Sequence, residues 1–358
     1  MFGVLLRSTH QGTVSCLRPV LGQAAPYPPS PLIQSITWDF DSLIRRAPGS
    51  DLWPTTWADD DNLYVSWGDG GGFGGTNKAG RVGLGVARLA GTAENFVGYN
   101  VFGSRKAEVP ASFTGKSNGM LSIDGTLYMS ITEEGKWLRL KIGRSTDHGR
   151  TWTFKSDDWI SHKGWDFAEP DGAFSDLSFL TFGRDYQGSR DSYVYAYSPE
   201  DRAKDPDGTQ SKDIGMFRVP KDQIVNRGAY EYFMGLDGSG RPRWTPDITK
   251  RQRVFNDPNG VGWGVRVTYS PGLDRYLLTA WHSKSGGWGI FDAPEPWGPW
   301  STIAYYDCWI DSTFKFGFTF PQKWMSADAK TMYMIFSGTD VYDSINVIKA
   351  TLTRREAE

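Results

Sequence analysis

The feature that most constrains the fold is a pair of short strands joined by an acidic or glycine-containing turn, which recurs five times along the chain. In each pair the second strand is rich in aromatic and β-branched residues, which is typical of β structure. The strand pairs are expected at residues 53–57 and 63–67, 119–123 and 127–130, 177–182 and 193–197, 264–269 and 276–281, and 323–325 and 332–336. Five equivalent units of this kind predict an all-β fold, a five-bladed β-propeller.

The chain length agrees with a repeat architecture. With 358 residues, the chain exceeds the size at which a single non-repeating core usually stops growing, about 250 to 300 residues. We expect residues 31–358 to form the propeller. Residues 1–30 are expected to be an N-terminal extension outside it, because four prolines between positions 26 and 31 disfavour a strand there.

The N-terminal segment and the cysteines give little information about location. The apolar run at residues 1–6 is interrupted by Arg7 and His10, so it does not form a convincing signal peptide. We nevertheless expect a secreted protein. Cys16 and Cys308 are far apart in the sequence, and we expect no bridge between them.

Charge and composition exclude several classes of partner. The chain has 39 Lys and Arg against 41 Asp and Glu, so it lacks the basic field that nucleic acids or anionic membranes require. No stretch approaches the roughly 20 apolar residues that cross a bilayer. With only 4 His and no His-rich cluster, we expect neither a metal nor another cofactor.

One turn carries a known structural signature. Residues 145–152 read Ser-x-Asp-x-Gly-x-Thr-Trp, which resembles the Asp-box of sialidases and other propellers. In such a turn the Asp accepts backbone N–H bonds and the Gly adopts a positive φ. We interpret it as a marker of architecture and not as a functional site.

Blade order predicts which residues share one face. In a propeller, residues before each inner strand and after each second strand open on the same face, whereas the turns between those strands lie on the opposite face. Asp51 and Asp69 flank the first strand pair in this way and are the expected catalytic carboxylates, next to the glycine-rich loop 70–75. The residues expected to bind substrate are Trp53, Lys116, Glu133, Asp176, Asn259, Trp263, Arg266 and His282.

Several segments resemble a known family. Residues 51–60, 66–75, 257–263, 291–300 and 323–326 are similar to a bacterial family of five-bladed propellers formerly of unknown function, some members of which are endo-D-arabinanases. The resemblance covers about residues 35 to 353. It implies the propeller fold and a carbohydrate substrate.

A shorter motif adds a further catalytic candidate. The segment Asn-Asp-Pro-Asn-Gly at residues 256–260 resembles the motif of invertase-like propellers, whose Asp is the nucleophile. The resemblance implies that role for Asp257. The alternative is an Asx-Pro turn that leads into the following strand.

The carboxylate pair favours glycoside hydrolysis of a polysaccharide or oligosaccharide. This reaction generally needs one carboxyl group as proton donor and another as nucleophile or base. The sequence leaves open which Asp is the acid and whether configuration is retained. Two alternatives remain: a polysaccharide lyase with His282 or a Tyr as base and Arg266 as its cationic partner, or a non-catalytic carbohydrate-binding propeller.

Overall fold

The computed structural model describes residues 16–19, 25–104, 106–156, 164–204, 211–282, 286–311, 313–338 and 343–356. Their regular structure is almost entirely β. The strands are β1 (Cys16–Pro19), β2 (Ile33–Arg46), β3 (Thr55–Trp57), β4 (Leu63–Gly68), β5 (Leu84–Ala90), β6 (Val97–Phe102), β7 (Lys116–Ile123), β8 (Thr126–Thr132), β9 (Leu140–Ser145), β10 (Ser178–Thr181), β11 (Tyr193–Pro199), β12 (Asp213–Pro220), β13 (Glu231–Leu236), β14 (Pro242–Thr245), β15 (Arg253–Asn256), β16 (Arg266–Ser270), β17 (Arg275–Trp281), β18 (Trp288–Ala293), β19 (Ser301–Ile310), β20 (Lys315–Thr319), β21 (Thr331–Gly338) and β22 (Ile345–Arg354). Short 3-10 helices are η1 (Arg184–Tyr186), η2 (Lys221–Gln223), η3 (Arg227–Ala229), η4 (Ile248–Lys250) and η5 (Gln322–Trp324).

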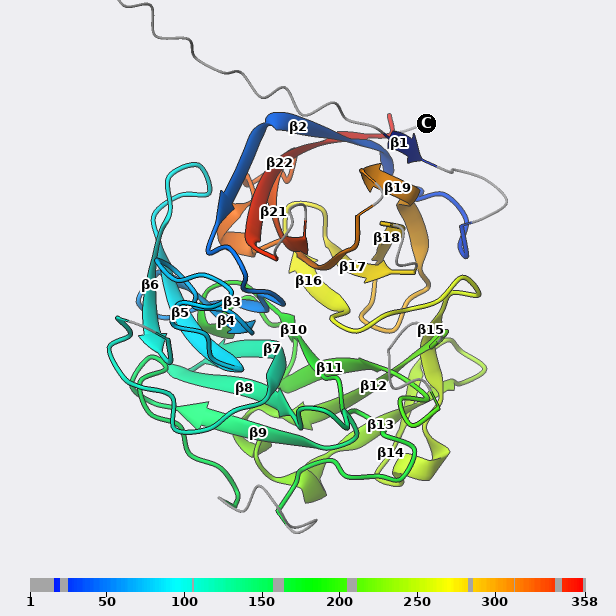
Figure 1. The fold of residues 1–358 in the computed structure, drawn as a ribbon. Helices are drawn as coiled ribbons and strands as arrows, with labels where there is room; N and C mark the ends of the chain where they lie inside the picture. Colours follow the sequence, from blue (N-terminus) through cyan, green and yellow to red (C-terminus); the bar gives the residue numbers. More distant parts are fainter. Residues whose placement is uncertain are drawn as a thin grey trace, which may run out of the picture.

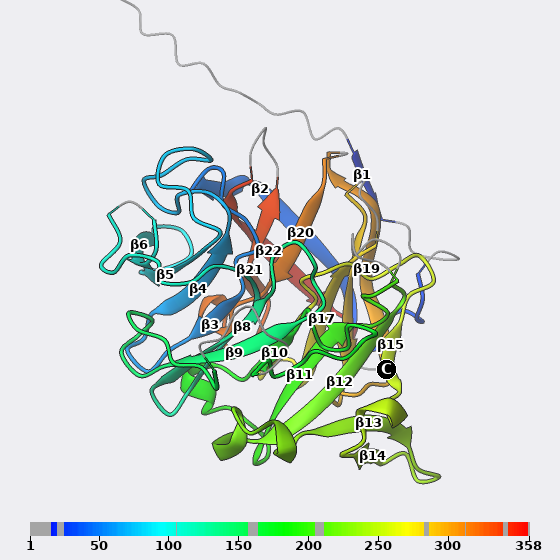
Figure 2. The same cartoon turned by 60° about the horizontal axis from the view of Figure 1, so that its bottom comes forward.

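The sheets follow one another around a central axis (Figure 1). Strands β3 to β6 form one antiparallel sheet, β7 to β9 a second, and β20 to β22 a third. The largest sheet contains two antiparallel runs, one starting at β10 and one at β16, which are joined by parallel pairing of β10 with β16. The β13–β14 hairpin lies at the outer edge of this arrangement, as Figure 2 also shows.

The strand pairs expected from the sequence agree with the structure in the first four units. The strand expected at residues 323–325 is wrong: the partner of β21 is β20, and η5 occupies the expected position. Pro321 precedes η5 and lacks the N–H that a ladder strand needs. The sequence pattern did not indicate β20, because this strand is irregular: Gly317 has a φ of 68°, and the pairing with β21 shifts register between Phe316 and Thr319.

The N-terminal part of the described chain packs on the sheets. Strand β2 pairs with β22, so segments from both ends of the sequence share one sheet, and β1 pairs with β19. The Tyr27 ring lies 5.0 Å from Phe255, and its hydroxyl accepts a hydrogen bond from Asn256 N at 2.8 Å. The described residues before position 31 therefore contact the sheets, in contrast to an extension that lies outside them.

The cysteines also differ from expectation. Cys308, in β19, is disulfide-bonded, so the expectation of unbridged cysteines is wrong. The chain contains two cysteines, and the backbone of Cys16 is in register with Ile310 across the β1–β19 pair. Sequence distance was misleading because strand pairing brings residues near position 16 beside residues near position 308.

Most of the tryptophans and phenylalanines that the structure describes are buried in the core between the sheets. Trp288 stacks on Phe318 with ring centroids 4.0 Å apart, and Trp309 meets Trp288 edge-on at 5.1 Å. All three rings are buried, and burial of such rings is a major source of stability. In the described ranges, no helix has the length and apolarity needed to span a membrane.

The acidic turns between first and second strands gather at one end of the sheets. The turn after β3 contacts two others, because Asp61 Oδ1 lies 2.9 Å from Lys323 Nζ and Arg184 donates to the Asp59 carbonyl oxygen. Asp185 accepts a hydrogen bond from Gly125 N at 3.1 Å. Since Asp51 precedes β3 and these turns follow it, the two groups lie at opposite ends of that strand.

Candidate active site

Asp51 and Asp69 are held at the same end of one sheet. The backbone of Asp51 exchanges two hydrogen bonds of 3.0 Å with Gly68, the last residue of β4, and Asp69 follows directly. Both aspartates line a cavity of about 370 Å³. The other lining residues are Leu52, Lys116, Asn118, Thr132, Trp137, Asp176, Arg202 and Trp263.

The backbone at this end of the sheet is strained. Leu52, Trp53 and Asp69 have φ values of 75°, 48° and 50°, a region that non-glycine residues rarely adopt and that costs of order 1–3 kcal/mol per residue. Gly68 allows close approach, because a Cβ there would lie 2.7 Å from Asp51 Oδ1. Such strain is typical of sites where side chains must be aimed at a ligand.

Asp51 has the surroundings of a protonated acid. Its Oδ1 atom is buried and has no hydrogen-bond partner among the described residues. Burial, followed by the negative charge of Asp343, raises the pKa of Asp51 well above its ordinary value, and Lys116 opposes this shift. The carboxyl group therefore favours its neutral form.

Asp69 has the opposite surroundings. Its Oδ1 atom lies 2.5 Å from Lys116 Nζ and 2.9 Å from Arg81 Nη2. The Lys116 ammonium also donates to the Gly83 carbonyl oxygen at 3.0 Å. The Asp69 side chain is 33% exposed, so it is an ion-paired carboxylate that a ligand can reach. Two carboxyl groups with such different environments are suited to different tasks in one reaction.

Asp176 is a third carboxyl group in the cavity. It is buried, and burial raises its pKa, while the charges of Arg202 and Arg266 act in the other direction. Arg266 does not line this cavity. Its guanidinium donates to Ser178 Oγ at 3.0 Å and to the Leu52 carbonyl oxygen at 3.3 Å, and burial lowers its pKa to about 10. Arg266 thus ties β10 and β16 to the segment that carries Asp51.

Asp257, Asn259 and His282 form a separate cluster around Tyr305. Asp257 accepts hydrogen bonds from Asn259 N at 2.9 Å and from the Tyr305 hydroxyl at 2.8 Å. The His282 ring stacks on Tyr305 with centroids 4.3 Å apart. Burial raises the pKa of Asp257 to about 6 and lowers that of His282. None of the three lines the 370 Å³ cavity, and the Asp257–Asn259 bond has the geometry of the Asx turn given as the alternative.

Two further expectations place residues wrongly. Trp53 is fully buried against Trp67 and donates to the Ser50 carbonyl oxygen at 3.1 Å, so it cannot stack on a sugar. Glu133 is ion-paired with Arg139 and does not line the cavity. Trp53 was misplaced because the positive φ values at Leu52 and Trp53 turn the ring inward, which sequence alone does not reveal.

The structure also adds residues that the sequence reasoning missed. Thr132 ends β8, and Arg202 lies shortly after β11. Both follow a second strand, so the rule that selected Asp69 could have found them. Trp137 lies in the loop before β9 and has a φ of 60°, a conformation for which the sequence gives no signal.

One group of described residues brings together side chains that could bind a metal, and it lies away from the cavity. Ligand atoms of Asp59, Asp60 and His148 are within 4.8 Å of one another. His148 Nε2 is already 2.8 Å from Asp59 Oδ1, and Asp60 accepts hydrogen bonds from Asn62 and Tyr64. These hydrogen bonds explain why the three side chains lie close together.

Comparison with protein families identifies the chain. The family described as "Domain of unknown function (DUF4185)" matches residues 76–346. The chain belongs to this family. The resemblance inferred from the sequence is therefore confirmed, although Asp51 and Asp69 precede the matched segment. Among curated proteins, none matches the DUF4185 chain.

Solved structures show the same fold at low sequence identity. A putative hydrolase from Bacteroides ovatus has 10% identity and a TM-score of 0.53, over 87% of this chain and 90% of that one. An α-L-arabinofuranosidase from Podospora anserina, in complex with cellotriose, has 10% identity and a TM-score of 0.50, over 86% and 91%. The catalytic domain of a GH62 α-L-arabinofuranosidase from Coprinopsis cinerea has 9% identity and a TM-score of 0.50, over 91% and 96%. This DUF4185 chain thus has the all-β, ring-like fold of those proteins.

Proposed function

We propose that this chain is a glycoside hydrolase built on a five-bladed propeller, with its active site in the 370 Å³ cavity. One observation carries the proposal: two carboxyl groups line the same cavity, one with a buried, unpartnered oxygen atom and a raised pKa and the other ion-paired. Cleavage of a glycosidic bond needs such a pair. The five strand runs that surround the axis support the blade count.

Asp51 is the proton donor in this proposal. Its neutral carboxyl group gives a proton to the glycosidic oxygen as the bond from that oxygen to the anomeric carbon breaks. Asp69 is the second carboxylate, which either attacks the anomeric carbon or takes a proton from the attacking water. The first route retains configuration and the second inverts it.

The other residues around the two carboxyl groups have positioning and binding tasks. Lys116 and Arg81 hold Asp69 in place through their ion pairs. Trp137 and Trp263 supply flat apolar rings to the cavity, and rings with a polar edge are suited to sugar faces. Asn118 and Arg202 supply donors for hydroxyl groups.

The proposed substrate is an arabinose-containing polysaccharide or oligosaccharide. The support comes from the family resemblance to endo-D-arabinanases and from the names of the two α-L-arabinofuranosidases that share the fold. We propose an extracellular location as well, because disulfides such as that of Cys308 persist in oxidising compartments.

A lyase reaction has less support from the geometry. His282 and Arg266 do not line the cavity that contains Asp51 and Asp69, and no Tyr is among the described residues that line it. His282 is stacked on Tyr305 and bonded to the Tyr306 carbonyl oxygen at 2.9 Å.

The test is a substrate panel. The full chain is incubated with D-arabinan, L-arabinan, arabinoxylan and xylan, and the products are separated by chromatography. We expect new reducing ends from an arabinose-containing substrate and no absorbance from unsaturated sugars. Unsaturated products would show a lyase, and binding without products on every substrate would show a carbohydrate-binding protein.

A further inference from the structure

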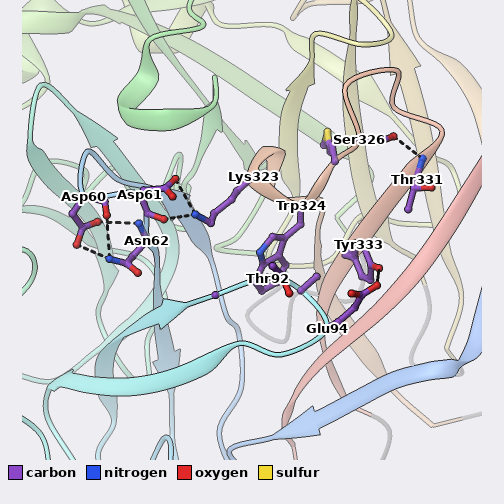
Figure 3. Close-up of a pocket in the computed structure, with 13 residues that line it drawn as sticks. Asp60, Asp61, Asn62, Thr92, Glu94, Lys323, Trp324, Ser326, Thr331 and Tyr333 are labelled. Carbon is purple, nitrogen blue, oxygen red and sulfur yellow. Dashed lines mark hydrogen bonds and ion pairs between the residues drawn. The ribbon is translucent and has the colours of Figure 1, made fainter.

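A second and larger cavity lies at the opposite end of the sheets. Its volume is about 590 Å³, and it is formed where the turn after β3 and the loop between β5 and β6 meet the segment from η5 to β21. In Figure 3, Asp60, Asp61 and Asn62 lie on one side, Tyr333 and Glu94 on the other, and Trp324 between them. None of its lining residues belongs to the cavity that contains Asp51.

Trp324 gives this cavity an aromatic wall with an unused donor. Its ring is 6% exposed and packs against Phe96, with centroids 5.7 Å apart. The indole Nε1 atom is buried and has no hydrogen-bond partner among the described residues. Among the described residues, Trp244, Trp288 and Trp309 also have buried indole N–H groups without a partner. Of these four tryptophans only Trp324 lines this cavity, so its N–H is the one that a hydroxyl group of a ligand bound there can pair with.

The polar groups around Trp324 are fixed in position. The Tyr333 hydroxyl donates to Glu94 Oε1, which joins β21 to the β5–β6 loop. Asp61 Oδ1 lies 2.9 Å from Lys323 Nζ and accepts a bond from Trp57 Nε1 at 2.9 Å. These bonds hold carboxylate and hydroxyl oxygens at the cavity without using all of their acceptor capacity.

The charge of the cavity selects the class of ligand. Three acidic side chains, Asp60, Asp61 and Glu94, line it together with one cation, Lys323, which is already paired with Asp61. An excess of carboxylates disfavours phosphate, sulfate and uronic acids. Hydroxyl groups can donate to carboxylate oxygens and accept from an indole N–H.

From this combination we infer that the second cavity is a binding site for a neutral oligosaccharide, separate from the active site. The inference does not depend on the chain being a hydrolase. In the full protein the site would hold one part of a polysaccharide while the opposite face engages another. Two linked contacts raise the effective affinity for a polymer without changing the affinity for a short fragment.

The test measures binding in a chain whose active site is inactivated. The Asp51→Asn protein is titrated by calorimetry with arabinohexaose and with xylohexaose, alone and combined with Glu94→Gln and Trp324→Phe. The Phe ring keeps the packing on Phe96 but lacks the N–H, and thermal unfolding checks that each variant is folded. We expect Glu94→Gln and Trp324→Phe to weaken one binding event, that at the second cavity, by 10-fold or more for at least one of the two sugars.

The matched control is Asp274→Asn, in an acidic turn outside this cavity, and it should leave both binding events unchanged. The inference is overturned if folded Glu94→Gln/Trp324→Phe protein binds both sugars as the parent does, or if neither sugar binds and tri-lysine does. If the sugars bind in the cavity but the wild-type chain cleaves no substrate, the inference stands and the proposed hydrolase function fails.

Discussion

Lys116 Nζ lies 2.5 Å from Asp69 Oδ1 and its charge also acts on Asp51, so one ammonium group connects the two carboxyl groups of the candidate active site. The lysine is the first residue of β7, whereas Asp51 precedes β3 and Asp69 follows β4. Neighbouring sheets therefore have to be correctly packed before the site is complete. Loss of this cation should change the chemistry more than the fold.

The first prediction concerns the carboxyl pair. Asp51→Asn and Asp69→Asn should each lower kcat by about 10²- to 10⁴-fold, the usual contribution of a positioned acid or base. Both replacements keep the side-chain size, so circular dichroism should show a folded protein. Turnover on the best substrate from the panel is the measurement.

Asp274→Asn is the control for these two variants, because its turn lies away from both cavities and its side chain is 73% exposed. It should keep full activity. If either active-site variant is as active as this control, that aspartate is not part of the catalytic pair.

The second prediction separates the two cations that contact Asp69. Lys116→Met should lower kcat by about 10-fold or more, since a largely buried charge pair is worth more than an exposed one. The side chain of Lys116 is 11% exposed and that of Arg81 is 45% exposed. Arg81→Gln should therefore change kcat by less than about threefold. Equal effects of the two substitutions would contradict this ranking.

Much of the fold could be predicted from the sequence, because strand pairs with acidic turns recur along the chain and the order of the strands in a blade then indicates which strand ends share a face. On this basis Asp51, Asp69, Lys116, Asp176 and Trp263 were predicted to lie on one face, and all five line one cavity. It failed where a backbone conformation or a long-range contact decides the outcome. The positive φ of Trp53 buries its ring, and Tyr305, in β19, draws Asp257 and His282 into a different cluster.

The third prediction contrasts Trp137, which lines the cavity, with Trp53, which is fully buried. Trp137→Ala should raise KM about fivefold with little change in unfolding free energy, because the ring lines the cavity and an aromatic contact is worth about 1 kcal/mol. Trp53→Ala should instead cost about 3 to 5 kcal/mol of stability, as expected for a fully buried ring. Initial rates and urea unfolding measure the two effects. A raised KM in a Trp53→Ala protein of unchanged stability would show that Trp53 binds substrate, as expected from the sequence.

The fourth prediction follows from the raised pKa of Asp51. Its folded-state pKa exceeds the ordinary value of 3.8, so the folded chain holds this proton more tightly than the unfolded chain does. The contribution of Asp51 to stability is therefore fully present below about pH 3.8 and is lost as pH rises through the folded-state pKa.

The variant that tests this prediction is Asp51→Asn, whose side chain cannot ionise. Its unfolding free energy should increase relative to that of the wild type as pH rises, by about 1.4 kcal/mol for each unit of pKa shift. Urea unfolding of both proteins from pH 3.5 to 7.5 measures this gain. Asp237→Asn is a control of opposite sign, because hydrogen bonds led by that of Ser239 lower the pKa of Asp237 from 3.8 to about 2. Its replacement should lose stability relative to the wild type as pH rises from about 2 to about 3.8, so this pair is measured over that lower range. A difference between Asp51→Asn and wild type that stays constant with pH would show that Asp51 is not held in its neutral form by the fold.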